Sequence, residues 1–369
     1  MINRLKKIIR KNEQISKVTM EKINSIVDSD SYYPDLNRKE REERISDNIK
    51  WYKEWGFVNS CYNEYGLDIK DFRNQDDYLE RYKIKKEKFE IHHVGKNGKG
   101  RNPRQHIMMT INKSLFYSYM EKIAPGKTPK MHLIFLGNRV LAPVFGDKTT
   151  SDFILSLPNG KYVCKPSSGQ KGNGFYIITK SNDDFVINGD KITKEEFFSE
   201  TKKTRYLLQD FIIQHNDMKV LSPSSVNTIR IVTTRWNNKT HIFCALVRLS
   251  AREDALIDNA SQGGTFIGVD EDTGKLRKYG RYFYQKIQDE RHPISDIKYE
   301  GYQIPFWEEI LDLVKKIHPL FDGLSTVGWD VAITENGPVI LEANSNYCTK
   351  MAQMANGGLK ERWYMLKEK

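Results

Sequence analysis

Three oxygen-bearing side chains near the end of the chain have the types and spacing of a metal site. Asp330 lies in one apolar run, and Glu342 and Asn344 lie two residues apart in the next run. The runs flank residues 335–338, a turn sequence of Glu, Asn, Gly and Pro that is typical of a β-hairpin. Mg²⁺ accepts carboxylate and amide oxygens and leaves coordination positions for phosphate. We therefore predict that these three side chains hold one or two Mg²⁺ ions.

The register of this hairpin decides whether the acids meet. A three-residue loop at residues 335–337 pairs Val331 with Leu341 and makes one face aliphatic. The same register places Asp330 opposite Glu342 on the other face, whereas a two-residue loop separates the two acids. With no arginine beside them, the two carboxylates repel each other unless a cation lies between. The alternative interpretation is a solvent-edge hairpin whose acids only keep it soluble.

Length and composition indicate a globular protein of two or three domains. The chain has 369 residues, of which 38% are hydrophobic and 11% aromatic, enough for sizeable cores. No apolar run is long enough to span a bilayer, and the N-terminus lacks the pattern of a signal peptide. We expect a cytoplasmic protein. The four cysteines are far apart and form no CxxC motif, so the spacing suggests neither a zinc site nor a disulfide framework.

Basic residues are concentrated in two places. The net charge is +11, and residues 81–130 hold 13 Lys or Arg against three acids, most densely at 95–104. Such a cluster attracts phosphates, nucleic acid or acidic sugars, and the alternative interpretation is a solvated basic loop. Residues 2–11 carry apolar side chains at helical spacing among basic ones. That helix could lie on an anionic membrane surface or dock on its own domain. Residues 13–90 are mostly helical in pattern.

Two lysines lie where they could bind phosphate. A helix is predicted from near Asn112 to before Pro125, with Lys113 in its first turn. A strand at 162–165 ends on Lys165 and leads into a glycine-rich loop at 166–174, which is dense in backbone N–H groups. The loop is neither a Walker A motif nor a dinucleotide-binding fingerprint, and by itself it also fits an ordinary surface turn.

Two further predicted strands carry arginines. Strands at 228–235 and 241–249 place Arg230 and Arg248 among β-branched neighbours. An arginine inside a sheet needs an anionic partner. The two arginines are therefore candidates for contact with a substrate anion.

The order of these features resembles the ATP-grasp superfamily, and most closely its sugar-transfer-associated branch. The ordered set is Lys113, Lys165 with its glycine-rich loop, Leu207 to Ile212, Asn227 to Arg230, Asn259 with Gly263-Gly264, and Asp330 with Glu342-Ala343-Asn344. The resemblance covers roughly residues 106–350. It implies an α+β fold in which two subdomains, 106–210 and 211–369, clasp ATP, preceded by a mainly helical basic region at 1–105.

The resemblance also implies roles for individual residues. Phosphates are expected to contact the two lysines and the loop, and adenine is expected to bind the backbone of the linker strand. The ATP-binding residues are then Lys113, Lys165, Ser168, Gly169, Gly172, Gly174, Gln209, Asp210, Phe211 and Ile212. Lys165, Arg230 and Asn259 are the expected catalytic residues, and Asp330, Glu342 and Asn344 the expected metal ligands.

The implied activity is an ATP-dependent carboxylate–amine ligase that forms an amide through an acyl-phosphate. The substrate is expected to be a sugar or amino-acid carboxylate in surface-polysaccharide assembly. Gln262 departs from the arginine that many glutamate-ligase relatives carry there, which leaves Arg248 and Arg252 as alternative carboxylate holders. One alternative is a small-molecule kinase. A second is a basic nucleic-acid-binding protein, which the absence of a recognised nucleic-acid motif disfavours.

We expect the N-terminal segment to bind an anionic membrane surface, at the inner face of the membrane, or an acidic glycan, in a manner that weakens with salt. The first eleven residues contain five Lys or Arg, and each contributes roughly 1 kcal/mol near an anionic bilayer. Removal of residues 1–12 should abolish co-sedimentation with anionic vesicles at low salt and leave ATP hydrolysis intact. Failure of the full-length protein to bind such vesicles would show that the helix docks on its own domain.

Overall fold

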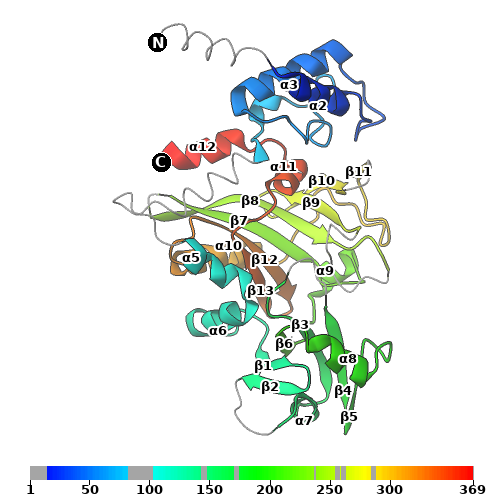
Figure 1. Cartoon of the computed structure of the whole chain (residues 1–369), viewed down its shortest axis with the longest axis vertical. Helices are drawn as coiled ribbons and strands as arrows, with labels where there is room; N and C mark the ends of the chain where they lie inside the picture. Colours follow the sequence, from blue (N-terminus) through cyan, green and yellow to red (C-terminus); the bar gives the residue numbers. More distant parts are fainter. Residues whose placement is uncertain are drawn as a thin grey trace.

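The computed structural model describes residues 15–81, 103–142, 148–169, 174–236, 238–253, 258, 263–283 and 288–368. Helices and two antiparallel sheets alternate along the chain, as the predicted α+β class requires (Figure 1). The helices are α2 (Lys17–Val27), α3 (Arg41–Trp55), η1 (Gln75–Asp77), α5 (Pro103–Ile111), α6 (Lys113–Ile123), α7 (Thr150–Leu155), α8 (Lys194–Thr201), α9 (Asn216–Leu221), α10 (Trp307–Ile317), η3 (His318–Leu320), α11 (Thr349–Asn356) and α12 (Lys360–Glu368).

The first sheet has the strand order β2-β1-β6-β3-β4-β5. Its strands are β1 (Met131–Leu136), β2 (Arg139–Ala142), β3 (Gly160–Pro166), β4 (Tyr176–Ser181), β5 (Asp184–Ile187) and β6 (Tyr206–Asp210). Helices α7 and α8 bury Ile154 and Phe197 against this sheet in a core that also holds Phe135 and Ile178. The sheet therefore forms a unit with a core of its own, and Lys165 lies near the end of its strand β3.

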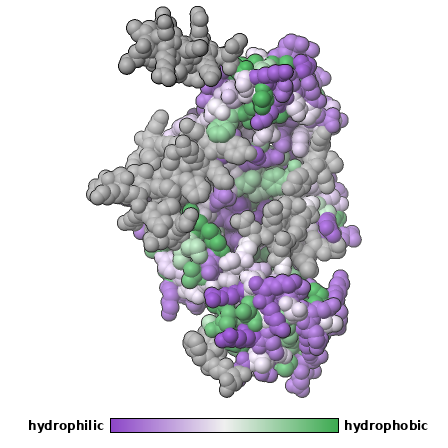
Figure 2. All heavy atoms as spheres, in the orientation of Figure 1, coloured by the Kyte–Doolittle hydropathy of each residue, from purple (hydrophilic) through white to green (hydrophobic). Residues whose placement is uncertain are grey.

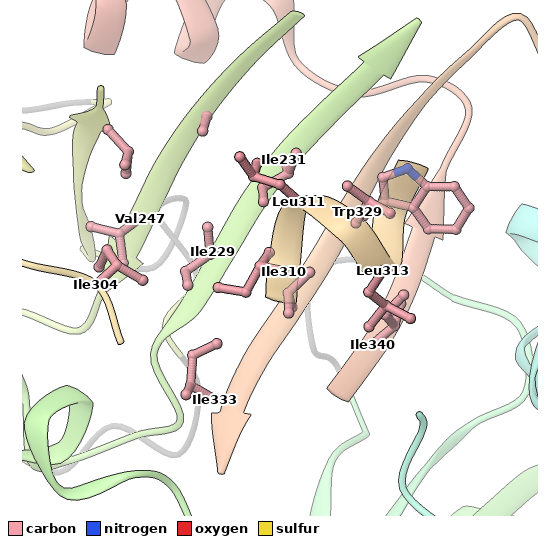
Figure 3. Packing of buried hydrophobic residues seen from close by; sticks show 14 of the residues in the cluster. Ile229, Ile231, Val247, Ile304, Ile310, Leu311, Leu313, Trp329, Ile333 and Ile340 are labelled. Atoms are coloured by element: carbon pink, nitrogen blue, oxygen red, sulfur yellow. The ribbon is translucent and has the colours of Figure 1, made fainter. Parts of the chain in front are cut away.

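The second sheet is larger and has the order β11-β10-β9-β8-β7-β12-β13. Its strands are β7 (Thr228–Trp236), β8 (Lys239–Leu249), β9 (Thr265–Val269), β10 (Leu276–Arg281), β11 (Gln288–Asp289), β12 (Thr326–Thr334) and β13 (Gly337–Asn344). One face packs on α10: Figure 3 shows Ile310 and Leu313 of the helix among Ile229, Val247 and Trp329 of the strands. Because side chains alternate along a strand, the residues between these point to the opposite face.

That opposite face has two uses. Beyond its polar end, Val232, Cys244 and Phe266 form a second core with Trp51 of α3 and Trp363 of α12. The N-terminal unit of residues 15–81 thus lies over this sheet together with α11 and α12 (Figure 1). The polar end of the same face remains for the site described below.

The hairpin joins its strands differently from the prediction, although Asp330 does pair with Glu342. The loop has two residues, because Thr334 pairs with Gly337, and Val331 pairs with Ile340 instead of Leu341. The register shifts between Asp330 and Val331, as in a β-bulge that adds one residue to β13. A two-residue loop alone would separate the acids. The bulge at Leu341 restores their pairing.

Other predicted elements are confirmed. Helix α6 begins at Lys113, and the side chain of Asn112 accepts a hydrogen bond from the backbone N–H of Leu115 as its N-cap. The predicted strands at 162–165, 228–235 and 241–249 correspond to β3, β7 and β8. The predicted basic helix at 2–11 and most of the basic segment at 95–104 lie outside the described residues.

The face of the molecule drawn in Figure 2 is mainly polar over its described residues. Figure 2 shows hydrophilic residues over both ends of the molecule, with hydrophobic ones in smaller patches. Among the described helices, none is both long and apolar enough to cross a membrane.

Gln353 of α11 holds the N-terminal unit on the second sheet. Its amide oxygen accepts from the backbone N–H of Leu79 at 2.7 Å, and its Nε2 donates to the Leu79 carbonyl at 2.9 Å and to Tyr65 Oη at 3.1 Å. The side chain is fully buried. Replacement leaves two buried backbone groups of Leu79 without partners, and each such group costs about 1–3 kcal/mol.

We therefore expect Gln353→Ala to lower the free energy of unfolding by about 3 kcal/mol in urea titrations. Gln303→Ala is the matched control, because Gln303 also donates to two carbonyls but is exposed. It should lose less than about 1 kcal/mol. Equal losses in the two variants would contradict a specific role for Gln353.

Candidate active site

A pocket of about 730 Å³ lies between the two sheets. Strands β3 and β6 of the first sheet and β7, β8, β12 and β13 of the second all contribute to its walls. The charged side chains that line it, among the described residues, are Lys113, Lys161, Lys165, Asp210, Lys219, Arg248, Asp258, Asp330, Glu335 and Glu342. Neighbouring apolar walls come from Val163, Phe175, Ile177 and Leu341. A concave site with apolar walls and convergent charges is typical of a small-molecule site.

Lys113 connects the two sheets across this pocket. It is the first residue of α6, which the Asn112 cap places beside the end of β3, and its backbone N–H donates to Ser167 O at 2.8 Å. Its Nζ donates to the carbonyl of Gly169 at 2.9 Å and lies 3.2 Å from Glu342 Oε1. One ammonium group therefore contacts both the glycine-rich loop and β13.

Lys165 also lines the pocket, near the end of β3. Its Nζ donates a hydrogen bond to the hydroxyl of Tyr117 at 2.7 Å. Burial lowers the pKa of the Lys165 ammonium to about 8, although the charges of Glu342 and Asp330 act in the opposite direction. An anion brought into the pocket, such as a phosphate, therefore raises this pKa and favours the charged form of the lysine.

Asp330 is buried between two arginines. It is 4% exposed, and Arg230, its cross-strand neighbour on β7, donates to both carboxylate oxygens, through Nε and, at 2.9 Å, through Nη2. Arg248 Nη2 adds a bond of 3.1 Å to Oδ2. Burial tends to raise the pKa of Asp330, but the two guanidinium groups outweigh it and lower the pKa below the ordinary value. Asp330 is therefore ionised, and its side-chain hydrogen bonds link β12 to β7 and β8.

Arg248 also belongs to a second pair. Its Nη2 lies 3.7 Å from Asp258 Oδ1 and donates to Thr228 Oγ1 at 2.6 Å. Thr228 in turn donates to Asp258 through its backbone N–H at 2.8 Å and through its hydroxyl. Burial raises the pKa of the Asp258 carboxyl in spite of the charge of Arg248. Arg248 is thus held in place at the pocket wall by two acids and a threonine.

The premise that no arginine lies beside the two acids is wrong. Arg230 and Arg248 compensate Asp330, and Lys113 compensates Glu342, so repulsion does not by itself require a metal ion. Both arginines are far from Asp330 in the sequence and reach it from neighbouring strands, so no local pattern indicated these contacts. The metal assignment therefore depends on the donor atoms themselves.

The oxygen atoms of these side chains are of the kind that Mg²⁺ accepts, and Glu342 is the more exposed of the two carboxylates. The Glu342 side chain is 30% exposed and faces Lys113 across the pocket. Asp330 accepts three hydrogen bonds from arginines and retains part of its oxygen lone-pair capacity. The Asn344 amide has a buried Nδ2 without a hydrogen-bond partner. Among the described residues, no group of three His, Cys, Asp or Glu side chains could hold a metal ion, so the predicted set depends on the Asn344 amide.

The strand expected to bind adenine lines the pocket. Gln209, Asp210, Phe211 and Ile212 all contribute to its wall, and Lys161 Nζ lies 5.8 Å from the centre of the Phe211 ring. Gln209 is buried, whereas Ile213 beyond the strand is exposed at 76%. The strand end therefore places apolar side chains at the wall, while the backbone N–H groups of Asp210 and Phe211 donate to the carbonyls of Lys130 and Lys161.

The remaining predicted residues divide into two groups. Arg230, Ser168, Gly174 and Asn344 are described, but they are not among the described residues that line the pocket. Arg230 lies behind Asp330, and Arg248 is the arginine at the wall. Gly172, Asn259 and Gln262 lie outside the described residues.

Sequence reasoning missed Tyr117, Thr228 and Asp258. Tyr117 follows Lys113 by four residues, which places both on one face of the predicted helix, so the spacing contained a signal for it. Thr228 and Asp258 had no such signal, because their contact spans 30 residues of sequence.

Comparison of the sequence with known protein families agrees with the fold and the pocket described above. The chain belongs to the sugar-transfer-associated ATP-grasp family, whose profile matches residues 99–367. The resemblance drawn from the ordered motifs is therefore confirmed, and with it the ATP-grasp fold. No curated protein matches the chain.

Several solved structures are similar at low identity. D-alanine–D-alanine ligase from Helicobacter pylori has 13% identity and a TM-score of 0.39, over 70% of this chain and 60% of that one. D-alanyl-alanine synthetase A from Vibrio cholerae has 12% identity and a TM-score of 0.40, over 70% and 61%. L-amino acid ligase from Bacillus licheniformis has 13% identity and a TM-score of 0.37, over 73% and 46%. The chain thus spans less than two thirds of each of these proteins.

The two carboxylates should differ in their effect on stability. Asp330→Asn leaves the buried Arg230 with a neutral partner and Arg248 with only Asp258, and breaking a buried ion pair typically costs about 3 kcal/mol or more. Glu342→Gln affects a partly exposed pair and should cost less than about 1 kcal/mol. Guanidinium unfolding of both variants tests this difference. A small loss for Asp330→Asn would mean that the arginines find other partners.

Proposed function

We propose that this chain is an ATP-dependent carboxylate–amine ligase that forms an amide through an acyl-phosphate. The observation that carries the proposal is the pocket between the sheets, which gathers Lys113, Lys165, Asp330, Glu342 and Arg248. Cations, carboxylates and a held arginine within one cavity are the groups that phosphoryl transfer requires. Membership of the ATP-grasp family supports the same class of chemistry.

ATP has a natural orientation in this pocket. Its phosphates would contact Lys113 and Lys165 beside Gly169, and its adenine would lie against the strand end at 209–212. Asp330, Glu342 and Asn344 would hold Mg²⁺, which when bound neutralises charge on the phosphates. The apolar walls shield the ring from water.

Arg248 is the residue best placed to hold the acceptor carboxylate. It lines the pocket, and its Nη1 has no hydrogen-bond partner among the described residues. A guanidinium edge binds a carboxylate or an acyl-phosphate oxygen in a fixed orientation. Asp258 and Thr228 prevent this edge from turning away. The arginine therefore first orients the carboxylate and then stabilises the negative charge that develops as the phosphoryl group is transferred.

The reaction needs no covalent intermediate on the protein. A carboxylate oxygen of the substrate attacks the γ-phosphorus, the bond to the bridging oxygen breaks, and ADP leaves. The amine nitrogen then attacks the acyl carbon, inorganic phosphate leaves with the C–O bond pair, and the amine proton passes to solvent. Lys165 and Arg248 stabilise the negative charge that develops on the phosphoryl and acyl oxygens.

The substrate proposal is a sugar or amino-acid carboxylate used in surface-polysaccharide assembly. The name of the family, which associates it with sugar transfer, supports it. The excess of basic residues at 81–130 suits a polyanionic or lipid-linked acceptor.

Incubation with ATP, Mg²⁺ and mixed carboxylates and amines tests the activity. We expect phosphate release that requires both a carboxylate and an amine, and Lys165→Met should reduce it about 100-fold because a charge that stabilises the transition state is lost. Lys122→Met is the control, since Lys122 is exposed at the end of α6. Phosphate transfer to a substrate without an amine would instead indicate a kinase.

A further inference from the structure

The hydroxyl of Tyr117 joins Lys165 to the hairpin that carries the predicted metal ligands. It accepts the hydrogen bond from Lys165 Nζ at 2.7 Å and donates to the carbonyl of Leu341 at 2.5 Å. Leu341 is the bulge residue that precedes Glu342 on β13 and has no register partner on β12. One buried hydroxyl therefore connects β3 of the first sheet with β13 of the second.

The direction of these bonds is fixed. A tyrosine hydroxyl has a single proton, which is committed to Leu341, so a lone pair must face Lys165. Tyr117 is 2% exposed, and its ring also lies 4.8 Å from Lys165 Nζ. The hydrogen bond and the ring together restrict the lysine to one position. Among the described residues, the ammonium has no other hydrogen-bond partner, which leaves donors for a phosphate.

Helix α6 carries both connections between the sheets. Lys113 and Tyr117 are four residues apart, on one face of the helix, and they contact Glu342 and Leu341, adjacent residues of β13. Figure 1 shows α6 beside the junction between the two sheets. The helix thus sets the distance between the phosphate-binding lysines and the predicted metal ligands.

We propose that Tyr117 is a positioning residue that holds Lys165 in the orientation in which it binds the phosphates of ATP. The proposal rests on the ligase function proposed above, because it requires ATP in this pocket. Tyr117 itself touches no phosphate. It acts through Lys165 and through the carbonyl of the bulge.

The test is the affinity for MgATP, measured by calorimetry. Tyr117→Phe keeps the ring and removes the hydroxyl, and loss of a hydrogen bond to a charged group should weaken binding about tenfold. Tyr119→Phe is the matched control. Tyr119 lies on the same helix and also donates to a carbonyl, that of Leu320, whereas Lys165 donates to the hydroxyl of Tyr117. Removal of the Tyr119 hydroxyl should leave the affinity for MgATP unchanged.

A double variant separates positioning from packing. In the Lys165→Met background, Tyr117→Phe should weaken MgATP binding no further, because the group that it positions is absent. An equal loss in both backgrounds would show that the hydroxyl only supports the fold, and no loss in either would also overturn the proposal. If the wild-type protein does not bind MgATP, the proposed function fails, and this inference fails with it.

Discussion

The burial of Asp330 between Arg230 and Arg248 is the constraint on which the site depends. A carboxylate that is 4% exposed is stable only with full compensation, and the two guanidinium groups provide it from β7 and β8. The same contacts fix Arg248 at the pocket wall, where it is available to a substrate anion. A structural ion-pair network and the proposed carboxylate site are thus one arrangement, and a change at Asp330 affects both.

The two faces of the second sheet have different roles, because side chains alternate along its strands. One face is apolar and packs on α10, as Figure 3 shows for Ile229, Val247 and Trp329. The other face carries the charged site at one end and the core shared with the N-terminal unit at the other. Helix α6 connects this sheet to the first one through Lys113 and Tyr117. The contacts that orient the two lysines therefore also join the two walls of the pocket.

Local patterns were sufficient for many of the elements. The Asn112 cap, the strand that ends on Lys165 and the hairpin around residues 335–338 follow from capping, periodicity and turn chemistry within a few residues. The loop length was predicted incorrectly because a bulge cannot be read from alternation alone. An inserted residue such as Leu341 looks like a continuing strand until its partner strand is known.

The sequence by itself determined the family, the α+β class and the hairpin that carries Asp330 and Glu342, since each depends on ordered motifs or on local turn chemistry; the bulge that pairs the two acids was visible only in the structure. Only the tertiary structure decided what surrounds those acids. Arg230 is separated from Asp330 by 100 residues and Arg248 by 82, so their contacts arise from the order of strands in a sheet. Tyr117 reaches Leu341 over 224 residues in the same way. Long-range pairing follows from global packing, which no local pattern of residues encodes.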